Sequence, residues 1–598
     1  MAEGKLSVLI LAAGKATRFK SEHSKMLHRL AGLPLGEYVL RTAMALHPTE
    51  TWMVIGHEAA EVRKAFERPG LVLIEQKEQR GTGHAVIAAR DELARSASPT
   101  VLILVGDAPL LAPETLEGLA AAHARARAAA TVLTTEVEDA TGYGRIVRKG
   151  GRVVGIVEEK VATAAERHIR EINSGILCFE RKKLLAHLDA LSDDNAQKEF
   201  LLTDLVGILT REREKVVAYP VADSRQVLGV NDRWELAGIE RILRLRKAEA
   251  LARDGVTIVA PDATYIDSDV EVGPDTVIEP GVSLLGQTRV GRACVLRPYS
   301  TITDSILGDR VTVRPCSVIS GSEVASDVFV GPFAHLRDGA VIEQNARIGN
   351  FVEVKKSRVG RGSKASHLTY LGDATLGANV NIGAGTVTCN YDGEKKNPTT
   401  IEEGTFIGSG TMLVAPVRVG RGAYVGAGST ITDDVPPESL ALGRAVQINK
   451  EGWVAQHKKS PAPRQAVPAP AHTYLAESSA KSTLKRRDVG EVTILDLGGR
   501  LTIGRPVDDL GRLVRETLAE GRRHILLDLK GLVYIDSSGV GGFMAGASAV
   551  RAAGGELRIS AVPSKILRLM EVSNLDRVFK IFQSEEAALK GFGGPSTS

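Results

Sequence analysis

A short repeat in the middle of the chain constrains its fold more than any other feature. Between Val256 and Ile448 an aliphatic residue followed by glycine recurs, and many intervals are 6, 12 or 18 residues. Such a hexapeptide repeat is typical of a parallel β-helix with a triangular cross-section, in which the aliphatic side chains point inward and small residues form the corners. The sequence therefore predicts a left-handed parallel β-helix over residues 256–457.

The residues before the repeat follow a different pattern. From Ser7 to about Val230 short apolar runs alternate with segments of helical composition. This alternation predicts a mostly parallel sheet covered by helices on both faces, a Rossmann-like α/β domain over residues 1–231, and ligands bind such sheets at the carboxyl ends of the strands. Residues 232–255 read as one amphipathic helix that links this domain to the β-helix.

Two further segments follow the repeat. Residues 458–490 are dominated by Pro, Ala, Ser and Lys, which indicates a flexible or semi-extended linker. Residues 491–592 regain strand and helix patterns and predict a small α/β domain with its own core. A linker of this length favours a last domain that moves independently of the rest.

Composition limits the compartment and the partners. The chain has 598 residues and a net charge of +4, so charge does not single out nucleic acid or a membrane surface. Four scattered cysteines without a CxxC pair predict reduced thiols in a cytoplasmic protein. The N-terminus lacks the pattern of a signal peptide, and no apolar run is long enough to span a bilayer.

A glycine-bearing loop directly follows the first predicted strand, in the stretch LILAAGKATRF that begins at Leu9. Backbone N–H groups in such a loop can cradle phosphates, and Lys15 and Arg18 add positive charge. Lys25 lies in the next loop and strengthens this interpretation. Asp107 ends a strand, where a carboxylate commonly holds Mg²⁺ on a triphosphate.

Other polar residues lie on loops beside the predicted strands. The side-chain amide of Gln76 and the turn at Gly81 and Thr82 suit recognition of a base edge. A solvated aspartate in a turn is the alternative for Asp107, and a plain strand–turn–helix is the alternative for the glycine-bearing loop. The remaining candidates on such loops are Gly144, Glu158, Asn173 and Asn231.

The β-helix carries a cluster that its architecture does not require. His367 interrupts the small residues expected at a corner, and an imidazole suits proton removal from an amine near neutral pH. Cationic side chains nearby suit a phosphate. A zinc-hydrolase interpretation needs three converging histidines, and only His335 and His367 lie in the repeat. The polar cluster consists of Arg337, Lys355, Tyr370, Asn381 and Lys396.

The order of the segments GKATR, EQRGTGHA, GDAP, GYGRI, VEEK, NSGI and GVND resembles the sugar-1-phosphate nucleotidyltransferases. With the β-helix attached, residues 5–456 resemble the bifunctional N-acetylglucosamine-1-phosphate uridyltransferase/glucosamine-1-phosphate acetyltransferase family. The resemblance implies UTP and N-acetylglucosamine-1-phosphate as substrates, with Asp107 and Asn231 holding Mg²⁺. It assigns nucleotide and sugar binding to Leu11, Ala12, Ala13, Gly14, Lys25, Gln76, Gly81, Thr82, Val105, Gly106, Asp107, Gly144, Glu158, Asn173 and Asn231.

The first domain departs from this family at three places. Ala16 and Phe19 stand in GKATRF, where family members usually have GxGTRM. The lysine loop reads Ser24-Lys25-Met26-Leu27 rather than PKVL, and Val105 often corresponds to Tyr. None of these changes removes a metal ligand or the lysine. They are therefore expected to alter the rate and the choice of nucleotide rather than to abolish uridyl transfer.

The second domain keeps every family residue at its predicted sites. By the resemblance, His367 is the general base for the amino group of glucosamine-1-phosphate, which then attacks the acetyl-CoA thioester. Arg337, Lys355, Tyr370, Asn381 and Lys396 bind the sugar phosphate. The resemblance assigns acetyl-CoA binding to Ala384, Asn390, Tyr391, Ser409, Ala427 and Arg444. β-Helices of this kind usually trimerise, with active sites between subunits, so a homotrimer is expected.

The last domain resembles the STAS domain of anti-sigma-factor antagonists, over residues 491–589. In that family the serine after the aspartate of YIDSSGVGG is phosphorylated by a partner kinase, which here is Ser537. A phosphate at a helix N-terminus adds charge to a surface that a partner covers. The alternative is an ordinary helix cap, since Asp and Ser are favoured N-caps.

These observations predict a bifunctional enzyme that makes UDP-N-acetylglucosamine, a precursor of peptidoglycan and lipopolysaccharide, with acetyl-CoA as co-substrate. Two alternatives stay open at the level of sequence. In one only the acetyltransferase half is active, and in the other the chain is a regulatory scaffold that uses its tail to bind a protein partner.

Overall fold

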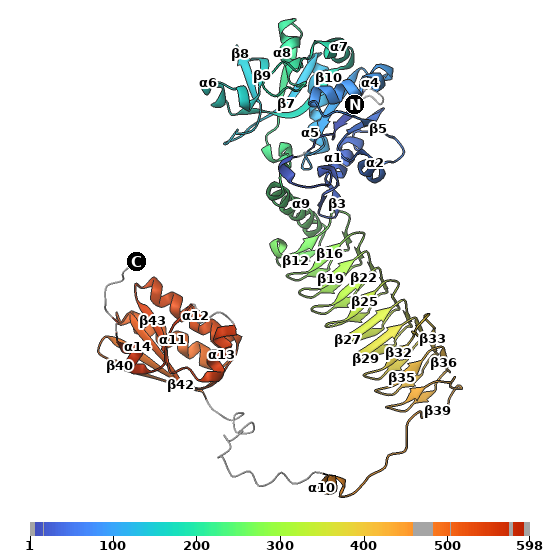
Figure 1. The fold of residues 1–598 in the computed structure, drawn as a ribbon, viewed down its shortest axis with the longest axis vertical. Helices are drawn as coiled ribbons and strands as arrows, with labels where there is room; N and C mark the ends of the chain where they lie inside the picture. The colour runs from blue at the N-terminus through green and yellow to red at the C-terminus, as the bar shows by residue number, and fades with distance from the viewer. Residues whose placement is uncertain are drawn as a thin grey trace. The chain divides into compact units, whose positions relative to one another are not determined.

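A computed structural model describes residues 6–15, 17–457, 482–502, 504–572, 578–590 and 592 of the chain. The chain divides into two compact units, residues 1–447 and 448–598, and each is described by itself (Figure 1). Ala16 and residues 458–481, which carry one of the family departures and most of the predicted linker, lie outside the described residues.

A mixed sheet forms the centre of the first domain, with the strand order β11-β7-β10-β6-β1-β4-β5. β1 is parallel to β4 and β6, whereas β10 runs antiparallel to both β6 and β7. The sheet is thus mostly parallel, with β10 as the antiparallel strand of this order; β10 follows the β8–β9 hairpin and the short helix α6 (Ala164–Arg167). The strands are β1 Leu6–Leu11, β2 Arg29–Leu30, β3 Leu33–Pro34, β4 Thr51–Ile55, β5 Leu71–Glu75, β6 Thr100–Val105, β7 Ala130–Glu136, β8 Arg145–Lys149, β9 Arg152–Val157, β10 Glu171–Glu180 and β11 Val216–Pro220.

Helices cover both faces of this sheet. Val8 and Ile10 of β1 point into one core and Leu9 into the other, as the two-residue period of a strand requires. A strand buried on both faces reads as a continuous apolar run, which is why LSVLIL has no alternation. The helices are α1 Leu35–Met44, α2 Ala59–Phe66, α3 Thr82–Ala88, α4 Arg90–Arg95, α5 Pro113–Ala126, α6 Ala164–Arg167, α7 Arg181–His187 and α8 Asp204–Arg211.

Helix α9, Arg233–Arg253, connects the first domain to the β-helix. Asp232 caps its N-terminus, because the Asp232 side chain accepts hydrogen bonds from the backbone N–H groups of Trp234 and Glu235. A second link joins α1 to the first coils, where Arg41 forms a bidentate ion pair with Asp269 at 2.5 and 3.0 Å.

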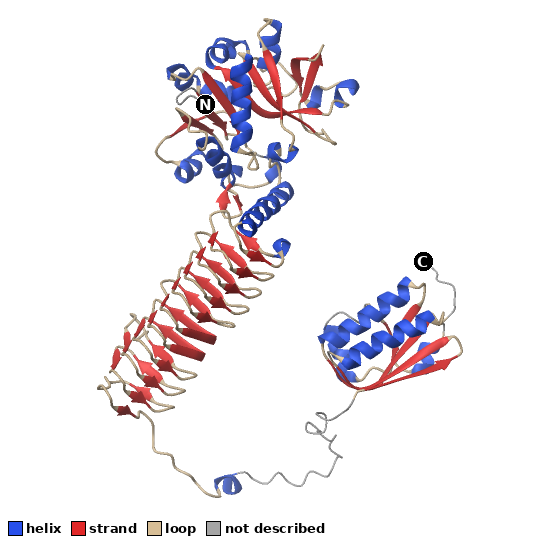
Figure 2. Cartoon of the chain, turned by 180° about the vertical axis from the view of Figure 1, so that it is seen from behind, coloured by secondary structure: helices blue, strands red, loops and turns tan. Residues whose placement is uncertain are grey.

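The β-helix consists of short strands that pair in parallel with the strand one coil further on (Figure 2). Aliphatic side chains from every coil fill one continuous core. The strands on two faces are β12 Thr257–Ile258, β13 Tyr265–Ile266, β15 Val277–Ile278, β16 Ser283–Leu285, β18 Val295–Leu296, β19 Thr301–Thr303, β21 Thr312–Val313, β22 Val318–Ser320, β24 Phe329–Val330, β25 His335–Arg337, β27 Arg347–Lys355, β29 Lys364–Gly372, β31 Asn381–Ile382, β32 Val387–Cys389, β34 Phe406–Ile407, β35 Met412–Val414, β37 Tyr424–Val425, β38 Thr430–Ile431 and β39 Leu440–Ala441. The strands on the third face are β14 Glu271–Val272, β17 Arg289–Val290, β20 Ile306–Leu307, β23 Glu323–Val324, β26 Val341–Ile342, β28 Arg358–Val359, β30 Ala374–Leu376, β33 Thr399–Ile401 and β36 Val417–Val419.

Two strands of the β-helix depart from the short pattern. β27 and β29 each have 9 residues. In earlier coils two separate short strands lie on either side of the same corner, whereas β27 and β29 continue through it. At this corner Asn350 pairs with His367, and Phe351 and Leu368 have left-handed backbones with φ of 55° and 49°. A bulky residue rarely adopts this conformation, yet it recurs at this corner, because Tyr299 and Phe333 in earlier coils share it.

The last domain has a five-stranded sheet in the order β40-β41-β42-β43-β44. Helices α11, α12 and α13 bury side chains such as Val514, Phe543 and Met570 in its main core. α14 packs Ala588 with Ile494 in a smaller cluster. The elements are β40 Thr483–Val489, β41 Val492–Leu501, β42 His524–Ile535, β43 Glu556–Ser560, β44 Lys580–Phe582, α11 Arg505–Ala519, α12 Ser537–Ala552, α13 Ser564–Val572 and α14 Glu585–Leu589, and α10 Trp453–His457 precedes them.

One strand of this domain falls inside the predicted linker. β40 pairs antiparallel with β41 from Thr483 to Val489, so ordered structure begins before residue 491. β40 lies at the sheet edge and carries Lys485, Arg486 and Arg487. Charged residues are typical of edge strands, and here they gave the segment the composition of a linker.

Candidate functional sites

A cleft of about 470 Å³ lies at the carboxyl ends of the central strands of the first domain. The loop after β1 and the end of β6 both line it, as expected for a ligand site of an α/β sheet. Ten of the predicted nucleotide-binding residues line this cleft: Leu11, Ala12, Ala13, Gly14, Lys25, Gln76, Gly81, Thr82, Val105 and Asp107.

Lys25 and Asp107 form an ion pair at the floor of this cleft. The Lys25 Nζ atom donates to Asp107 Oδ2 at 2.5 Å and to the carbonyl oxygen of Val230 at 2.8 Å. The side chains of Lys25 and Asp107 are only 12% and 24% exposed. Asn231 follows Val230, and its Oδ1 atom accepts a hydrogen bond from Arg18 at 2.7 Å. The chain thus brings two side-chain oxygens of the kind that bind a metal ion close to two cations.

The other end of the cleft is shaped by Gly81 and Gln76. Gly81 has φ of 103°, and a Cβ atom there would lie 2.5 Å from the carbonyl oxygen of Phe200. Glycine is therefore required at this position for both conformation and space. The buried Gln76 side chain contacts the carbonyl oxygen of Gly81 and the Nδ1 atom of His84. This arrangement presents amide and backbone groups of the kind that read a base edge.

Three predicted sugar-binding residues lie together outside the lining of this cleft. The backbone N–H of Asn173 donates to the carbonyl oxygen of Gly144 at 2.8 Å. A Cβ atom on Gly144 would lie 3.5 Å from Glu158 Oε2, so Gly144 and Glu158 are neighbours. Burial raises the pKa of the adjacent Tyr143, and the negative charge of Asp107 adds to this effect. Gly106 also lies outside the lining; its backbone N–H donates to the carbonyl oxygen of Leu11 at 2.9 Å.

Sequence reasoning missed a segment that joins both ends of this site. Glu199 and Gln79 line the cleft, and the Thr203 hydroxyl donates to Glu158 Oε1 at 2.9 Å. One residue before Thr203, the backbone N–H of Leu202 donates to the Thr82 hydroxyl at 3.1 Å. The stretch EFLLTD that contains these contacts has no pattern that marks it as a site.

Three cations converge on one face of the β-helix. Arg337 and Lys355 occupy equivalent positions on the neighbouring strands β25 and β27. The ammonium of Lys396 lowers the pKa of Lys355, and Arg337 contributes to this shift. Like charges that lie this close in the absence of ligand are suited to binding a dianion such as a phosphate.

Tyr370 lies on the next strand of the same face. It pairs with Glu353, which also forms an ion pair with Arg337 at 3.1 Å. The Tyr370 hydroxyl accepts a long hydrogen bond from Asn390 at 3.5 Å. The predicted sugar-phosphate residues Arg337, Lys355, Tyr370 and Lys396 therefore share one region of the β-helix.

His367 lies on β29, three residues before Tyr370 and one coil before the first of the predicted acetyl-CoA residues. The backbone N–H of Gly385 donates to the carbonyl oxygen of Leu368, so Ala384 is one coil away from His367. The N–H of Gly410 donates to the carbonyl oxygen of Ala384, and that of Gly428 to the carbonyl oxygen of Ser409. His367, Ala384, Ser409 and Ala427 thus follow one another along successive coils.

The remaining predicted residues flank this column. Asn390 donates to Asp373 Oδ2 at 2.5 Å, and Tyr391 forms a β-bridge with Lys396. Arg444 donates to the carbonyl oxygen of Ala427 at 2.8 Å. Asn381 pairs with Lys364, three residues before His367. No three histidines, cysteines or carboxylates that could hold a metal ion cluster among the described residues of the β-helix.

The predicted phosphorylation site lies at the start of α12. Asp536 is the N-cap of this helix, because its side chain accepts a hydrogen bond from the N–H of Gly539 at 2.9 Å. Ser537 is the first helical residue and not the cap, and its side chain lies outside the described residues. The backbone N–H of Asp536 donates to the carbonyl oxygen of Leu501, which ties the start of α12 to β41.

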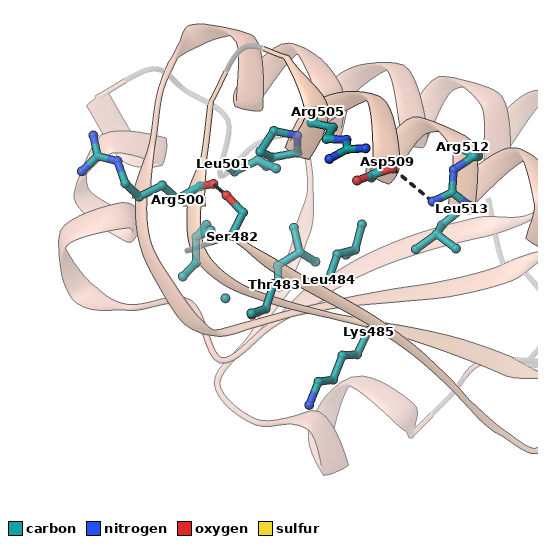
Figure 3. A pocket seen from close by; sticks show the side chains of 14 residues that line it. Ser482, Thr483, Leu484, Lys485, Arg500, Leu501, Arg505, Asp509, Arg512 and Leu513 are labelled. Atoms are coloured by element: carbon teal, nitrogen blue, oxygen red, sulfur yellow. Dashed lines mark hydrogen bonds and ion pairs between the residues drawn. The ribbon is translucent and has the colours of Figure 1, made fainter. Parts of the chain in front are cut away.

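A second cleft, of about 460 Å³, lies between β40, β41 and α11 (Figure 3). Leu484 and Leu513 face each other across it. Its cations are partly engaged, since Arg512 pairs with Asp509 and Arg500 stacks on Tyr534. The cleft therefore has a mixed lining of leucines and charged side chains, and it borders the β41 segment that holds the N-terminus of α12.

Three family models match the chain. The MobA-like NTP transferase domain matches residues 8–215, the six-repeat bacterial transferase hexapeptide matches residues 398–433, and the STAS domain matches residues 484–588. The predicted fold of three parts is confirmed. Together these parts define a nucleotidyltransferase domain joined to a hexapeptide-repeat acyltransferase, with a STAS domain attached.

Curated relatives identify the family. The bifunctional protein GlmU of Koribacter versatilis is 50% identical over 459 residues, which are 76% of this chain and 97% of the relative. Those of Trichlorobacter lovleyi and an Anaeromyxobacter species are 50% identical over 75% and 78% of this chain and 97% and 96% of the relatives. The chain belongs to the GlmU family, and it is a bifunctional enzyme with uridyltransferase and acetyltransferase domains. Among the described residues, no helix combines the length and apolar character that crossing a membrane demands.

Proposed function

We propose that the chain makes UDP-N-acetylglucosamine in two steps on two domains. The β-helix transfers an acetyl group from acetyl-CoA to glucosamine-1-phosphate, and the first domain then transfers UMP from UTP to N-acetylglucosamine-1-phosphate. The observation that carries the first step is the place of His367 on β29, three residues before Tyr370 and one coil before Ala384. A base at this place has a phosphate site on one side and an acyl-donor site on the other.

In the acetyl transfer His367 acts as the general base. Its Nε2 atom takes a proton from the amino group of glucosamine-1-phosphate, while Arg337, Lys355 and Lys396 hold the phosphate. The amine nitrogen then forms a bond to the thioester carbonyl carbon. The carbon–sulfur bond breaks, and the proton held by His367 is available to the departing thiolate. An amide and free coenzyme A result.

In the uridyl transfer the first domain acts mainly by placing charged side chains beside the triphosphate. A sugar-phosphate oxygen attacks the α-phosphorus of UTP, and the bond to pyrophosphate breaks. Lys25 is fixed by Asp107 and Val230, so its ammonium is oriented before the triphosphate arrives. Gln76, Gly81 and the backbone nearby bind uracil. The sugar lies against Gly144, Glu158 and Asn173.

The residues at Asp107 and Asn231 fit Mg²⁺. One carboxylate and one amide oxygen are hard ligands of the kind that Mg²⁺ takes, with phosphates and water completing its coordination. Each of these oxygens accepts a hydrogen bond from a cation, Lys25 or Arg18, which supports the proposal that a positive ion binds here. When bound, the ion neutralises charge on the triphosphate.

An exposed apolar corner supports a homotrimer. Tyr299, Phe333, Phe351 and Leu368 all have positive φ, and each side chain is at least half exposed. The rings of Phe333 and Phe351 stack with centroids 5.3 Å apart. Large apolar side chains lined up in a strained conformation favour an interface with other copies. Because Leu368 adjoins His367, the acetyltransferase site lies next to that interface.

The compartment and pathway follow from the substrates. We place the enzyme in the cytoplasm, where UTP and acetyl-CoA are available and where the four unpaired cysteines remain reduced. Its product supplies precursors of peptidoglycan and lipopolysaccharide.

A coupled assay tests both activities on one protein. Glucosamine-1-phosphate, acetyl-CoA, UTP and Mg²⁺ are supplied, and thiol and pyrophosphate release are read separately. We expect His367→Ala to lower thiol release by about a hundredfold or more and to leave uridyl transfer from supplied N-acetylglucosamine-1-phosphate intact. We expect Asp107→Ala to abolish pyrophosphate release alone. If neither product forms, the scaffold alternative holds; if only thiol appears, only the acetyltransferase half is active.

For the STAS domain we propose that it recruits or localises the enzyme through a protein partner, such as a kinase or an anti-sigma-like protein, and that Ser537 is a phosphosite. The observation behind this is that Asp536 already caps α12, which leaves Ser537 without the cap role. Ser537→Asp should weaken capture of a partner from host lysate, whereas Ser584→Asp, at the cap of α14, is the control. Equal capture by wild type and Ser537→Asp would contradict the switch.

A further inference from the structure

Asn350 contacts His367 at the corner that β27 and β29 share. The Nδ1 atom of His367 lies 2.6 Å from the Oδ1 atom of Asn350, and the two residues are direct partners in the parallel ladder. Asn350 is half-buried, whereas His367 is exposed. The contact therefore joins the Asn350 side chain, which packs against neighbouring coils, to the His367 side chain, which faces solvent.

The chemistry of this contact fixes the protonation of the ring. A carboxamide oxygen only accepts hydrogen bonds, so the Nδ1 atom of His367 must carry the proton. The neutral imidazole then has its lone pair on Nε2. Among the described residues none forms a hydrogen bond with Nε2, and this atom is therefore open to a substrate.

The surrounding coils give Asn350 its position. Gly349 precedes it, and a Cβ atom there would lie 1.9 Å from the carbonyl oxygen of Ser366. The two corners therefore pack backbone against backbone, which brings Asn350 and His367 close together. The charged residues of the same strands lie three positions away: Arg347 and Lys364 before the pair, and Glu353 after Asn350, paired with Arg337. Asn350 is the polar group in direct contact with the ring.

We infer that Asn350 is a positioning residue for the acetyl transfer, which selects the Nε2-basic tautomer of His367 and holds the ring toward the amine. This inference rests on the proposed role of His367. A neutral partner has a consequence for the chemistry, because it orients the imidazole without stabilising the imidazolium as a carboxylate does.

Two substitutions separate positioning from a merely structural role. Asn350→Ala removes the acceptor, and we expect kcat for thiol release to fall about 10- to 100-fold while KM for both substrates changes less than threefold. Asn350→Asp keeps an acceptor, so the plateau of kcat at high pH should return to within about fivefold of wild type. Its negative charge favours the imidazolium, so the acidic limb of the kcat/KM profile should move up by about one pH unit.

Gln344→Ala is the matched control, since Gln344 is an amide on the β-helix surface that donates to Asp327 at 3.2 Å. It should behave as wild type, and uridyl transfer should be unchanged in every variant. If Asn350→Ala retains kcat, or if Asn350→Asp leaves the acidic limb in place, the inference is wrong. If His367→Ala retains thiol release, the proposed function of His367 fails instead. The two failures are thus read from different variants.

Discussion

Lys25 offers the sharpest test of the uridyltransferase site. Its ammonium has three N–H groups, and two of them are used by Asp107 at 2.5 Å and Val230 at 2.8 Å. The third is left for the triphosphate. The substitution Lys25→Met keeps the apolar stem and removes both the charge and this oriented donor.

The expected magnitude follows from that geometry. Removing one preorganised donor from a partly desolvated site costs roughly 3–4 kcal/mol of transition-state stabilisation, which is about 10²- to 10³-fold in rate. The Lys25 side chain is 12% exposed, so solvent screens its charge only weakly. We therefore expect kcat/KM for pyrophosphate release to fall by that factor.

The assay measures pyrophosphate release from UTP and N-acetylglucosamine-1-phosphate, with thiol release from the β-helix as the internal control for folding. Lys77→Met is the matched variant, because Lys77 is exposed and adjoins Gln76 without lining the cleft. If Lys25→Met stays within threefold of wild type, Lys25 does not act on the triphosphate. Equal loss of both activities would mean that the substitution unfolds the protein.

Three other changes probe separate features. Gly81→Ala places a Cβ atom against the carbonyl oxygen of Phe200, so we expect a higher KM for UTP and a lower Tm. Gly155→Ala is the control, because a Cβ atom there meets open space, and it should change neither quantity. Because Lys396 lowers the pKa of Lys355, the KM for the sugar phosphate should rise as pH rises through that lowered pKa. The substitution Lys396→Ala raises the pKa of Lys355, so the rise in KM should move to higher pH. If the pH profile of KM does not move, Lys396 does not act on Lys355. Deleting residues 458–598 should leave both activities within about threefold, and outright loss of either would make the tail part of the catalytic unit.

The β-helix was the most predictable part of the chain because its signal repeats in every coil. The same periodicity contains a contact that the sequence prediction overlooked: Asn350 lies one coil of 17 residues before His367, as the strand pairing shows. Coil spacing alone would have made these residues neighbours. The hydrogen bond between Asn350 and His367 also requires that β27 and β29 continue through the corner. Amino-acid composition does not reveal that feature.

The first domain was predictable only where a motif follows a strand. Asp107 and Lys25 stand at such places, but the approach of the Phe200 carbonyl to Gly81 joins segments over 100 residues apart. No local pattern encodes a contact of that range. The prediction that residues 483–489 belong to a linker was wrong for another reason. An edge strand carries charged residues that prevent pairing with other chains, and these residues gave β40 the composition of a linker.

The order of the coils has an energetic consequence. A β-helix is a one-dimensional stack, in which each coil is stabilised mainly by its two neighbours, and its ends open more readily than its middle. Ala427 and Arg444 lie in the last coils, after β36, whereas Arg337 and Lys355 lie in the interior of the stack. On the proposed assignment of these residues, local unfolding that begins at β39 would release acetyl-CoA while the sugar-phosphate site remains folded, so the two substrates of one reaction would bind regions of unequal local stability.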